Sequence, residues 1–187
     1  MKTLLLFAIC LLSFTICKAQ RVSYNDLIFV LNHDVDATED YLSNKGFEFS
    51  KVDTLTNTAH SSRRIINGYD FGKVDTLEQI SYIFTKNSSH DKWYISVEKK
   101  SIKEIFYEVS MYTTFQADYL AIKAFIKKLG YKPLNTKVNN GDLVTTYKKG
   151  FMEISFMLTH DEKLDFTTYY ISITDTDKEK AAWKLSE

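Results

Sequence analysis

Three of the four histidines in this chain stand directly before an aspartate, as His33-Asp34, His90-Asp91 and His160-Asp161. An imidazole beside a carboxylate can hold a metal ion or transfer a proton. However, no second histidine follows any of them at the i, i+4 spacing of a helical zinc motif. The second and third pairs also lie between predicted strands, where short polar residues favour chain reversal. We therefore expect turns at these pairs, no metal site and no other cofactor.

Other catalytic patterns are equally sparse. The sequence has no Gly-x-Ser-x-Gly elbow, no glycine-rich phosphate loop and no Ser-x-x-Lys at a predicted helix start. Both cysteines, Cys10 and Cys17, lie in the apolar N-terminal segment, so the remaining chain has no thiol for a disulfide, a zinc site or a nucleophile. Because 24 basic residues balance 24 acidic residues, no charge excess predicts nucleic-acid binding.

The N-terminal segment has the pattern of a bacterial export signal. A positively charged start precedes an uncharged run from Leu4 to Ile16, which is too short to cross a hydrocarbon core of ~30 Å as a helix. Small residues occupy the third and the first position before the Ala19–Gln20 peptide bond, namely Cys17 and Ala19. We expect cleavage after Ala19, a mature chain that begins at Gln20, and a periplasmic or secreted location.

An alternative interpretation makes Cys17 a lipidated N-terminus. Bacterial lipoprotein signals have a small residue before the cysteine, whereas this chain has Ile16 there, so the pattern favours a chain without a lipid anchor. No later apolar run is long enough to predict a transmembrane segment.

Two segments have the apolar spacing of amphipathic helices. The first spans Ser23 to Lys45, with Ser23 and Asp26 as a capping pair and a possible second start at Asp36 and Glu39 that would divide it. Gly46 follows as a left-handed cap.

The second helix is predicted to begin at Thr113 with Gln116 as its capping pair and to end at Gly130. Each glycine is followed by an aromatic residue and then by runs that alternate with period two. The alternating runs are Ile80 to Lys86, Trp93 to Glu98, Glu104 to Tyr112, Leu143 to Lys148, Met152 to Thr159 and Thr167 to Thr174.

These elements predict an α+β fold of two tandem helix-plus-antiparallel-sheet units, α-β-β-β-β twice, with the helices on one sheet face. The expected organisation is a signal peptide at 1–19, a first unit at 20–112, and a second unit with a C-terminal tail at 113–187. The tail from Asp175 to Glu187 can either dock as a short helix or stay loose.

A short internal repeat accompanies this pattern. Gly46 to Leu55 and Gly68 to Leu77 agree at seven of ten positions, which indicates a local tandem duplication or similar edge strands by chance. Duplication predicts an extra strand or long hairpin around Thr56 to Asn67. Both copies hold an Asp-Thr-apolar triplet, so Thr54 and Thr76 are weak candidates for O-glycosylation, although a strand threonine beside an aspartate is the simpler interpretation.

Aromatic residues are predicted on the sheet face away from the helices. This set is Tyr94, Phe106, Tyr112, Phe166 and Tyr170. Mixed with Ser, Thr and Glu, these rings can form a binding surface, because tyrosine offers a large contact area and a polar tip. Alternatively, they pair across strands or fill a core between the two units.

The order of elements resembles tandem helix-plus-sheet proteins such as the β-lactamase inhibitory proteins. The resemblance covers most of the mature chain but rests on element order alone, and the two cysteine pairs of those inhibitors are absent. It implies inhibition of a hydrolase as an analogy at the level of the fold, with no binding residue carried over.

The sequence favours an exported, non-catalytic module that binds another exported or envelope protein, as an inhibitor or an immunity-type protein. One alternative is a small-ligand-binding protein or a small hydrolase with its site between the two units, using His33 or His160 with neighbouring acids. Another alternative is a structural envelope protein. A binding module requires an exposed aromatic face, whereas catalysis requires convergent acids and histidines in a closed pocket.

Overall fold

The chain folds into helices and antiparallel strands, as the alternation of helical and period-two patterns predicts. The computed structural model describes residues 21–57, 65–66, 69–70, 77–87, 94–139, 142–161 and 166–185. The predicted signal peptide and the His90-Asp91 pair lie outside the described residues. In chain order the elements are α2 (Tyr24–Asn32), α3 (Val35–Ser43), β1 (Glu48–Asn57), β2 (Ile65–Ile66), β3 (Tyr69–Asp70), β4 (Leu77–Asn87), β5 (Tyr94–Ile102), β6 (Ile105–Thr113), α4 (Gln116–Lys128), β7 (Lys132–Asn139), β8 (Asp142–Lys149), β9 (Met152–Asp161), β10 (Phe166–Asp175) and α5 (Thr176–Lys184).

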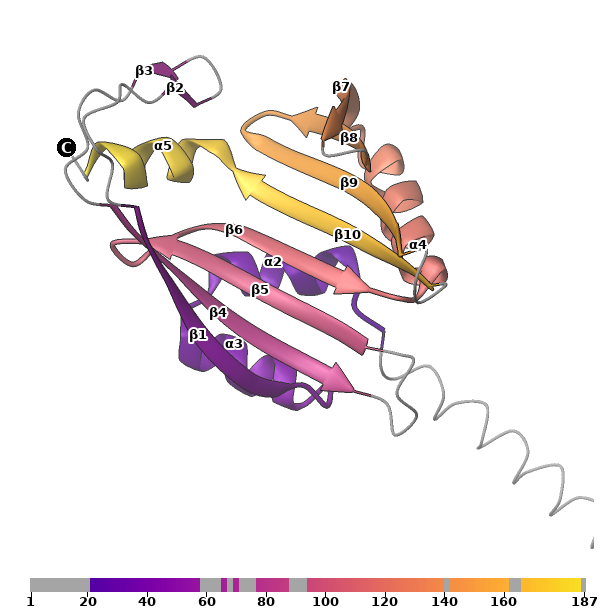
Figure 1. The fold of residues 1–187 in the computed structure, drawn as a ribbon, viewed down its shortest axis with the longest axis horizontal. Helices are drawn as coiled ribbons and strands as arrows, with labels where there is room; N and C mark the ends of the chain where they lie inside the picture. Colours follow the sequence, from indigo (N-terminus) through magenta and orange to yellow (C-terminus); the bar gives the residue numbers. More distant parts are fainter. Residues whose placement is uncertain are drawn as a thin grey trace, which may run out of the picture.

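Eight of these strands form one antiparallel sheet in the order β1-β4-β5-β6-β10-β9-β8-β7 (Figure 1). Each run of four consecutive large strands is a meander, and the two meanders meet where β6 pairs with β10, with Tyr112 opposite Tyr170. The predicted mixed α+β class and antiparallel sheet are confirmed. Of the short β2–β3 ladder, β2 lies at the end of the segment Thr56 to Asn67, where the internal repeat predicts an extra strand or hairpin, and β3 lies just beyond it.

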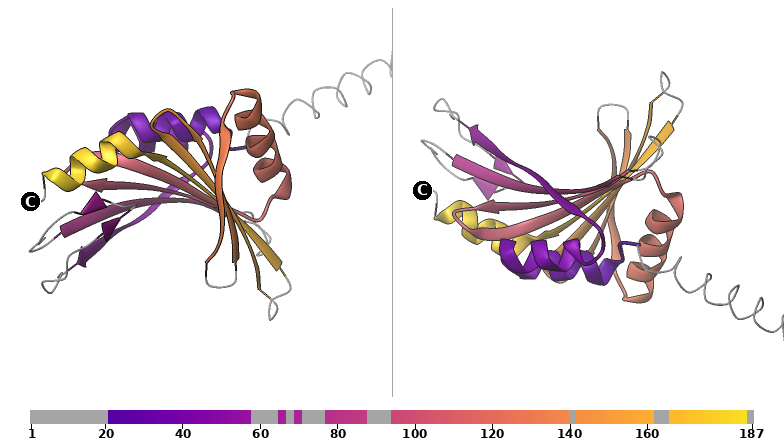
Figure 2. Two further views of the ribbon diagram at one scale, coloured as in Figure 1. Left: turned by 90° about the horizontal axis from the view of Figure 1, so that it is seen from above. Right: turned by 90° about the horizontal axis from the view of Figure 1, so that it is seen from below.

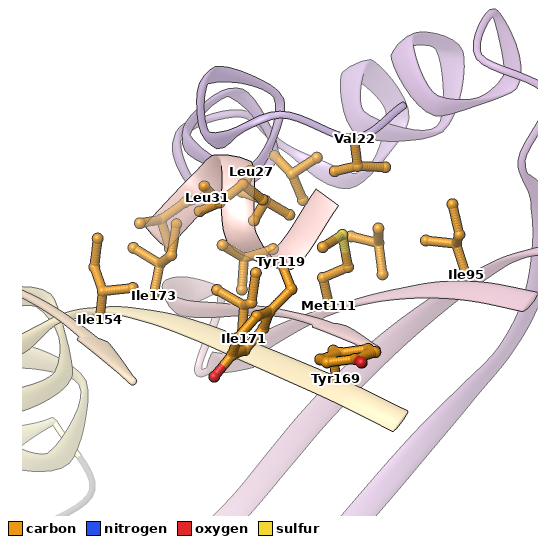
Figure 3. Packing of buried hydrophobic residues seen from close by; sticks show 14 of the residues in the cluster. Val22, Leu27, Leu31, Ile95, Met111, Tyr119, Ile154, Tyr169, Ile171 and Ile173 are labelled. Carbon is orange, nitrogen blue, oxygen red and sulfur yellow. The ribbon is translucent and has the colours of Figure 1, made fainter. Parts of the chain in front are cut away.

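Helices α2, α3 and α4 pack on one face of the sheet, and Figure 2 shows α2 and α4 on the same side of the twisted strands. Alternate strand residues point to this face and meet the apolar stripes of the helices. The resulting core contains rings as well as aliphatic side chains (Figure 3). Its members include Leu27, Val30 and Leu31 of α2, Leu42 of α3, Tyr119, Ile122 and Ile126 of α4, and Val97, Met111, Phe156, Ile171 and Ile173 of the sheet.

The first helical segment begins and ends as its sequence predicts. Ser23 and Asp26 form a reciprocal capping box at the start of α2. Asp26 is buried, and its carboxylate accepts a 2.5 Å hydrogen bond from the Tyr41 hydroxyl. The Lys45 ammonium lies 3.2 Å from the same carboxylate, so Asp26 connects α2 to α3 and the residues that follow it. Burial raises the pKa of Asp26, but bonds from Tyr41, Ser23 and Lys45 outweigh it and leave the pKa lowered.

Two glycines end helices in the left-handed conformation, as predicted. Gly46 has φ +80° after α3 and Gly130 has φ +87° after α4, a region that other residues enter only at a cost. The predicted helix starts are less accurate. The Asp36 and Glu39 start is wrong, because Asp34 caps α3 by accepting a 2.8 Å bond from the Ala37 amide.

The expected Thr113–Gln116 capping pair of α4 is also wrong. The N-cap residue is Phe115, which has no side-chain cap, while the Thr113 hydroxyl accepts a 3.0 Å bond from the Phe115 amide. At the C-terminus the tail docks as α5, which Asp175 begins by accepting bonds from the Asp177 and Lys178 amides. The pairing of β6 with β10 ends at Glu108 of β6. Helix α5 runs beside the part of β6 that precedes Glu108.

One lysine is fully buried beneath α2. Lys99 on β5 is 0% exposed, and its ammonium donates to the Val30 carbonyl at 2.5 Å and to the His33 carbonyl. These carbonyls lie in the last turn of α2 and just after it, where backbone acceptors lack helical partners and the helix dipole favours a cation. The ring of Phe106 lies 3.9 Å from the same nitrogen.

The burial of Lys99 predicts a pH-dependent stability. Burial lowers the pKa of Lys99 to about 8, with Asp34 opposing and Lys178 reinforcing the shift. Because the unfolded chain keeps this proton up to the usual lysine pKa of 10.5, the contribution of Lys99 to stability rises with pH between these values. Lys99→Met, which leaves two carbonyls unpaired, should cost about 2 kcal/mol near neutral pH.

We expect the difference in unfolding free energy between the native chain and Lys99→Met to widen from about pH 7.5 to about pH 9.5, measured by urea unfolding. Ionisation of tyrosines in the unfolded chain affects both proteins equally and cancels in this difference. A difference that stays constant across this range would show that Lys99 titrates as an exposed lysine does.

Candidate functional site

The sheet face opposite the helices, here called the open face, carries polar side chains at the strand positions that alternate with the core. Over it lies a hollow of about 640 Å³, here called the trough. The trough is lined by Lys100 (β5), Glu108 (β6), Asn135, Lys137 and Val138 (β7), Val144 and Thr146 (β8), Glu153 and Ser155 (β9), Tyr170, Ser172 and Thr174 (β10), and Glu179 (α5). Six strands and one helix therefore contribute to a single site that spans the β6–β10 seam.

A pair of tyrosines lies at that seam. Tyr112 and Tyr170 are register partners, and their ring centroids are 4.6 Å apart at an interplanar angle of 49°. Burial, followed by the nearby Tyr170 and Glu98, raises the pKa of Tyr112 to about 12. The pKa of Tyr170 is also raised, first by burial and then by Glu108. Both phenols therefore remain protonated at physiological pH and can donate hydrogen bonds.

An ion pair forms the floor next to the tyrosines. The Lys100 ammonium lies 2.7 Å from a Glu108 carboxylate oxygen, and the side chains are only 20% and 17% exposed. Burial lowers the pKa of Lys100, but the adjacent Glu108 carboxylate outweighs it, and the pKa is raised overall. The pair therefore keeps its charges, and Lys100 is largely neutralised by Glu108.

Glu179 brings a second carboxylate to the trough from α5. Burial raises its pKa, as do the carboxylates of Glu108 and Glu153, whereas a hydrogen bond from Trp183 opposes the shift. The helix is held in place by Ala182 and Trp183, which pack in a small cluster with Ile102 and Tyr107. The position of Glu179 therefore depends on the docking of the C-terminal tail.

The opposite wall of the trough comes from β8 and β9. The hydroxyls of Thr146 and Ser155 lie 2.9 Å apart, and Lys148 contacts Glu153 at 2.7 Å. Among the lining residues, three carboxylates therefore face two lysines, Lys100 and Lys137. The trough offers hydroxyls, the Tyr170 phenol and a small excess of negative charge to a ligand.

The five predicted aromatic residues do not all meet at the trough. Tyr170 lines the trough, its register partner Tyr112 lies beside it outside the lining, and Phe166 is exposed at the start of β10. Tyr94 begins β5 opposite Asn87, and its side chain is outside the described residues. The prediction that Phe106 shares this face is wrong, because its ring contacts Lys99 and lies 6.0 Å from Tyr82, both on the helix side.

A β-bulge explains the position of Phe106. The register between β5 and β6 shifts at Lys100 and Ser101, so that Lys100 faces Glu108 whereas Ser101 faces Phe106. One extra residue in β6 inverts the alternation on one side of the shift. A pattern of period two, applied without the bulge, therefore assigns Phe106 to the wrong face.

The histidine–aspartate pairs have local structural partners. The ring of His33 stacks on Phe29 at 3.7 Å, while Asp34 caps α3. His160 Nδ1 lies 3.2 Å from the Thr167 hydroxyl on the neighbouring strand. No group of three or more His, Cys, Asp or Glu side chains in the described parts of the chain is placed to hold a metal ion.

The modification candidates lie away from the trough. Thr54 is exposed on β1 opposite Ile80, and Thr76 lies outside the described residues. Sequence reasoning missed Lys100, Glu108 and Glu179. The first two could have been found as polar residues at alternating strand positions, whereas the position of Glu179 depends on how α5 docks.

Comparisons with protein-family models, curated proteins and solved structures find no match to this chain. Within the residues that the structure covers, no helix has the length and apolar character needed to cross a bilayer.

Because the Lys100–Glu108 ion pair is partly buried, neutralising Glu108 should lower the unfolding free energy measurably. Glu108→Gln should lower the unfolding free energy by about 2 kcal/mol, between the values for exposed and fully buried pairs, because it leaves the Lys100 ammonium without its counter-charge. Urea unfolding of the variant and the native chain measures this loss.

The matched control is Glu153→Gln, which breaks the Lys148–Glu153 pair. The two charged groups of this pair are also 2.7 Å apart, but the side chains are more exposed, at 43% for Lys148 and 23% for Glu153. It should cost less than about 1 kcal/mol because water screens the pair. Equal losses for the two variants would contradict the interpretation that burial strengthens the Lys100–Glu108 pair.

Proposed function

We propose that this chain is an exported, non-catalytic module that binds another exported or envelope protein in the trough. The observation that carries the proposal is the composition of the trough, in which the Tyr170 phenol, several hydroxyls and a partly buried ion pair line about 640 Å³, with the Tyr112 ring in contact with Tyr170 just outside the lining. Tyrosines beside short hydroxyl side chains are typical of protein-binding surfaces. Secondary structure holds these groups in place before a partner binds.

The charges in the trough favour a partner segment with a lysine or arginine. Glu108 and Glu153 already have lysine partners at 2.7 Å. Glu179 lies near both of these carboxylates, which raise its pKa, so an incoming cation beside Glu179 would relieve that repulsion. A basic side chain inserted beside Glu179 would also lower the pKa of that carboxyl toward its ordinary value.

The same proposal includes export and a two-unit organisation. Residues 1–19 would direct export and be removed after Ala19. The units 20–112 and 113–187 would each contribute two helices and a four-stranded meander, and the strand order supports the two meanders. The trough would then lie across the seam between the units. An inhibitor of an exported hydrolase, or an immunity-type protein against an exported toxin, fits this arrangement.

A capture experiment with matched variants tests the proposal. The chain from Gln20 to Glu187 is used as bait against envelope and secreted fractions of the native host, and retained proteins are identified by mass spectrometry. The test variant is Tyr170→Ala with Glu179→Gln, which removes one phenol and one carboxylate from the trough. We expect loss of the partner and, for the purified pair, an affinity at least about tenfold weaker.

The control variant is Phe151→Ala with Glu39→Gln, which removes an exposed ring and an exposed acid outside the trough. It should bind as the native chain does. A partner that both variants retain would contradict the trough as its binding site.

A small polar ligand is the second candidate, because the trough volume lies in the range of small-molecule sites. Native mass spectrometry of the protein purified from its host distinguishes the two. A small molecule that co-purifies with the native protein but not with the variant Tyr170→Ala with Glu179→Gln would favour a small ligand over a protein partner. The hydrolase alternative lacks such support, since His33 and His160 are exposed and have the local partners described above.

A further inference from the structure

Strand β1 forms one outer edge of the eight-stranded sheet, and it is unusually exposed. Its large apolar side chains Phe49, Val52 and Leu55 are 43%, 48% and 59% exposed. The register pairs it with β4 alone among the described strands, so its outer row of backbone N–H and C=O groups has no strand partner there. Such an edge is a template for another strand.

The other outer edge, β7, differs in a way that discourages pairing. It contains Pro133, which cannot donate to a ladder, and the exposed Lys132 and Lys137. Both edge strands have a register shift near their start, but β1 continues from Lys51 to Asn57 without a proline. The free edge of β1 is therefore the better site for strand addition.

The sequence of β1 is complementary to itself in the antiparallel direction. When two copies are aligned on Val52, that residue faces Val52 of the second copy, and each Lys51 faces an Asp53. Opposite charges and β-branched residues that lie directly across from each other stabilise two antiparallel strands. Because the pairing is two-fold symmetric, the Lys51–Asp53 contact occurs twice.

The faces of the strand agree with this alignment. Val52 lies opposite Tyr82 in the register with β4, on the side where the core packs, whereas Lys51 and Asp53 lie on the other side, 2.6 Å apart. In the single chain, Lys51 contacts the exposed Asp53 of the same strand. In the pairing, each Lys51 can contact the Asp53 carboxylate of the second copy instead. Val52 is removed from water at the same time.

We propose that a second copy of this chain adds to the outer edge of β1, antiparallel and centred on Val52, so that the two sheets become continuous. The pairing leaves the trough of each copy free, because its lining comes from β5 to β10 and α5. This inference is independent of what the trough binds.

Charge reversal tests the register of the pairing. The native chain should sediment as a concentration-dependent dimer in analytical ultracentrifugation. Lys51→Asp places Asp opposite Asp53, and Asp53→Lys places Lys opposite Lys51, so each variant alone should be a monomer at the same concentration. An equimolar mixture of the two variants should dimerise again, because each Asp then faces a Lys.

Two results would overturn the proposal. One is a native chain that stays monomeric at its highest soluble concentration. The other is a dimer that both single variants keep, since it would then use another surface. Rescue by mixing separates pairing from misfolding, because misfolded variants would not regain a dimer on contact with one another.

A cysteine cross-link provides a second measurement. The chain from Gln20 onward has no cysteine, so Val52→Cys introduces one thiol directly opposite its copy, where Cβ atoms about 4.5 Å apart come within reach of a disulfide. Thr54→Cys is the matched control on the same exposed strand, because its two copies would be offset by about 13 Å. Mild oxidation should cross-link the first variant and leave the second uncross-linked. Equal cross-linking of both variants would contradict the proposed centre.

Discussion

A β-sheet has two faces, and the helices α2, α3 and α4 of this chain all pack on the same one. This constraint organises the molecule. Along each strand, one residue enters the core and the next points to the open face, so every strand must be apolar and polar in alternation. The open face satisfies its polar groups by pairing them with one another or with water. The trough is the part of that face where such groups converge and the surface is hollowed.

Two neighbouring lysines on β5 show how strongly the two faces differ. Lys99 lies under α2, where backbone carbonyls accept its protons, and burial lowers its pKa to about 8. Lys100 points the other way, and although burial lowers its pKa, Glu108 outweighs that effect and raises it. Identical side chains one residue apart therefore serve different purposes. Lys99 fixes the end of a helix, whereas Lys100 contributes charge to a candidate binding surface.

Local sequence signals predicted the fold well and the site only in part. The Ser23–Asp26 capping box, Gly46 and Gly130 mark helix ends through contacts within a few residues, and the structure has them as predicted. Phe106 was misplaced because a bulge depends on how two strands pair, which one strand's pattern does not contain. The cap of α3 was misplaced by two residues because several acids in that stretch could each begin a helix.

Glu179 is the clearest case of a site residue that only tertiary structure supplies. Nothing in its neighbourhood distinguishes it from the other charges of the tail until Asp175 ends β10 and begins α5. The burial of Ala182 and Trp183 then fixes the helix beside β6, and Glu179 approaches Glu108 and Glu153. Gathering carboxylates costs folding free energy through their repulsion, and the apolar burial of Ala182 and Trp183 opposes that cost. The tail is therefore best understood as the element that completes the trough, because its apolar residues hold in place a charge that the fold alone would disfavour.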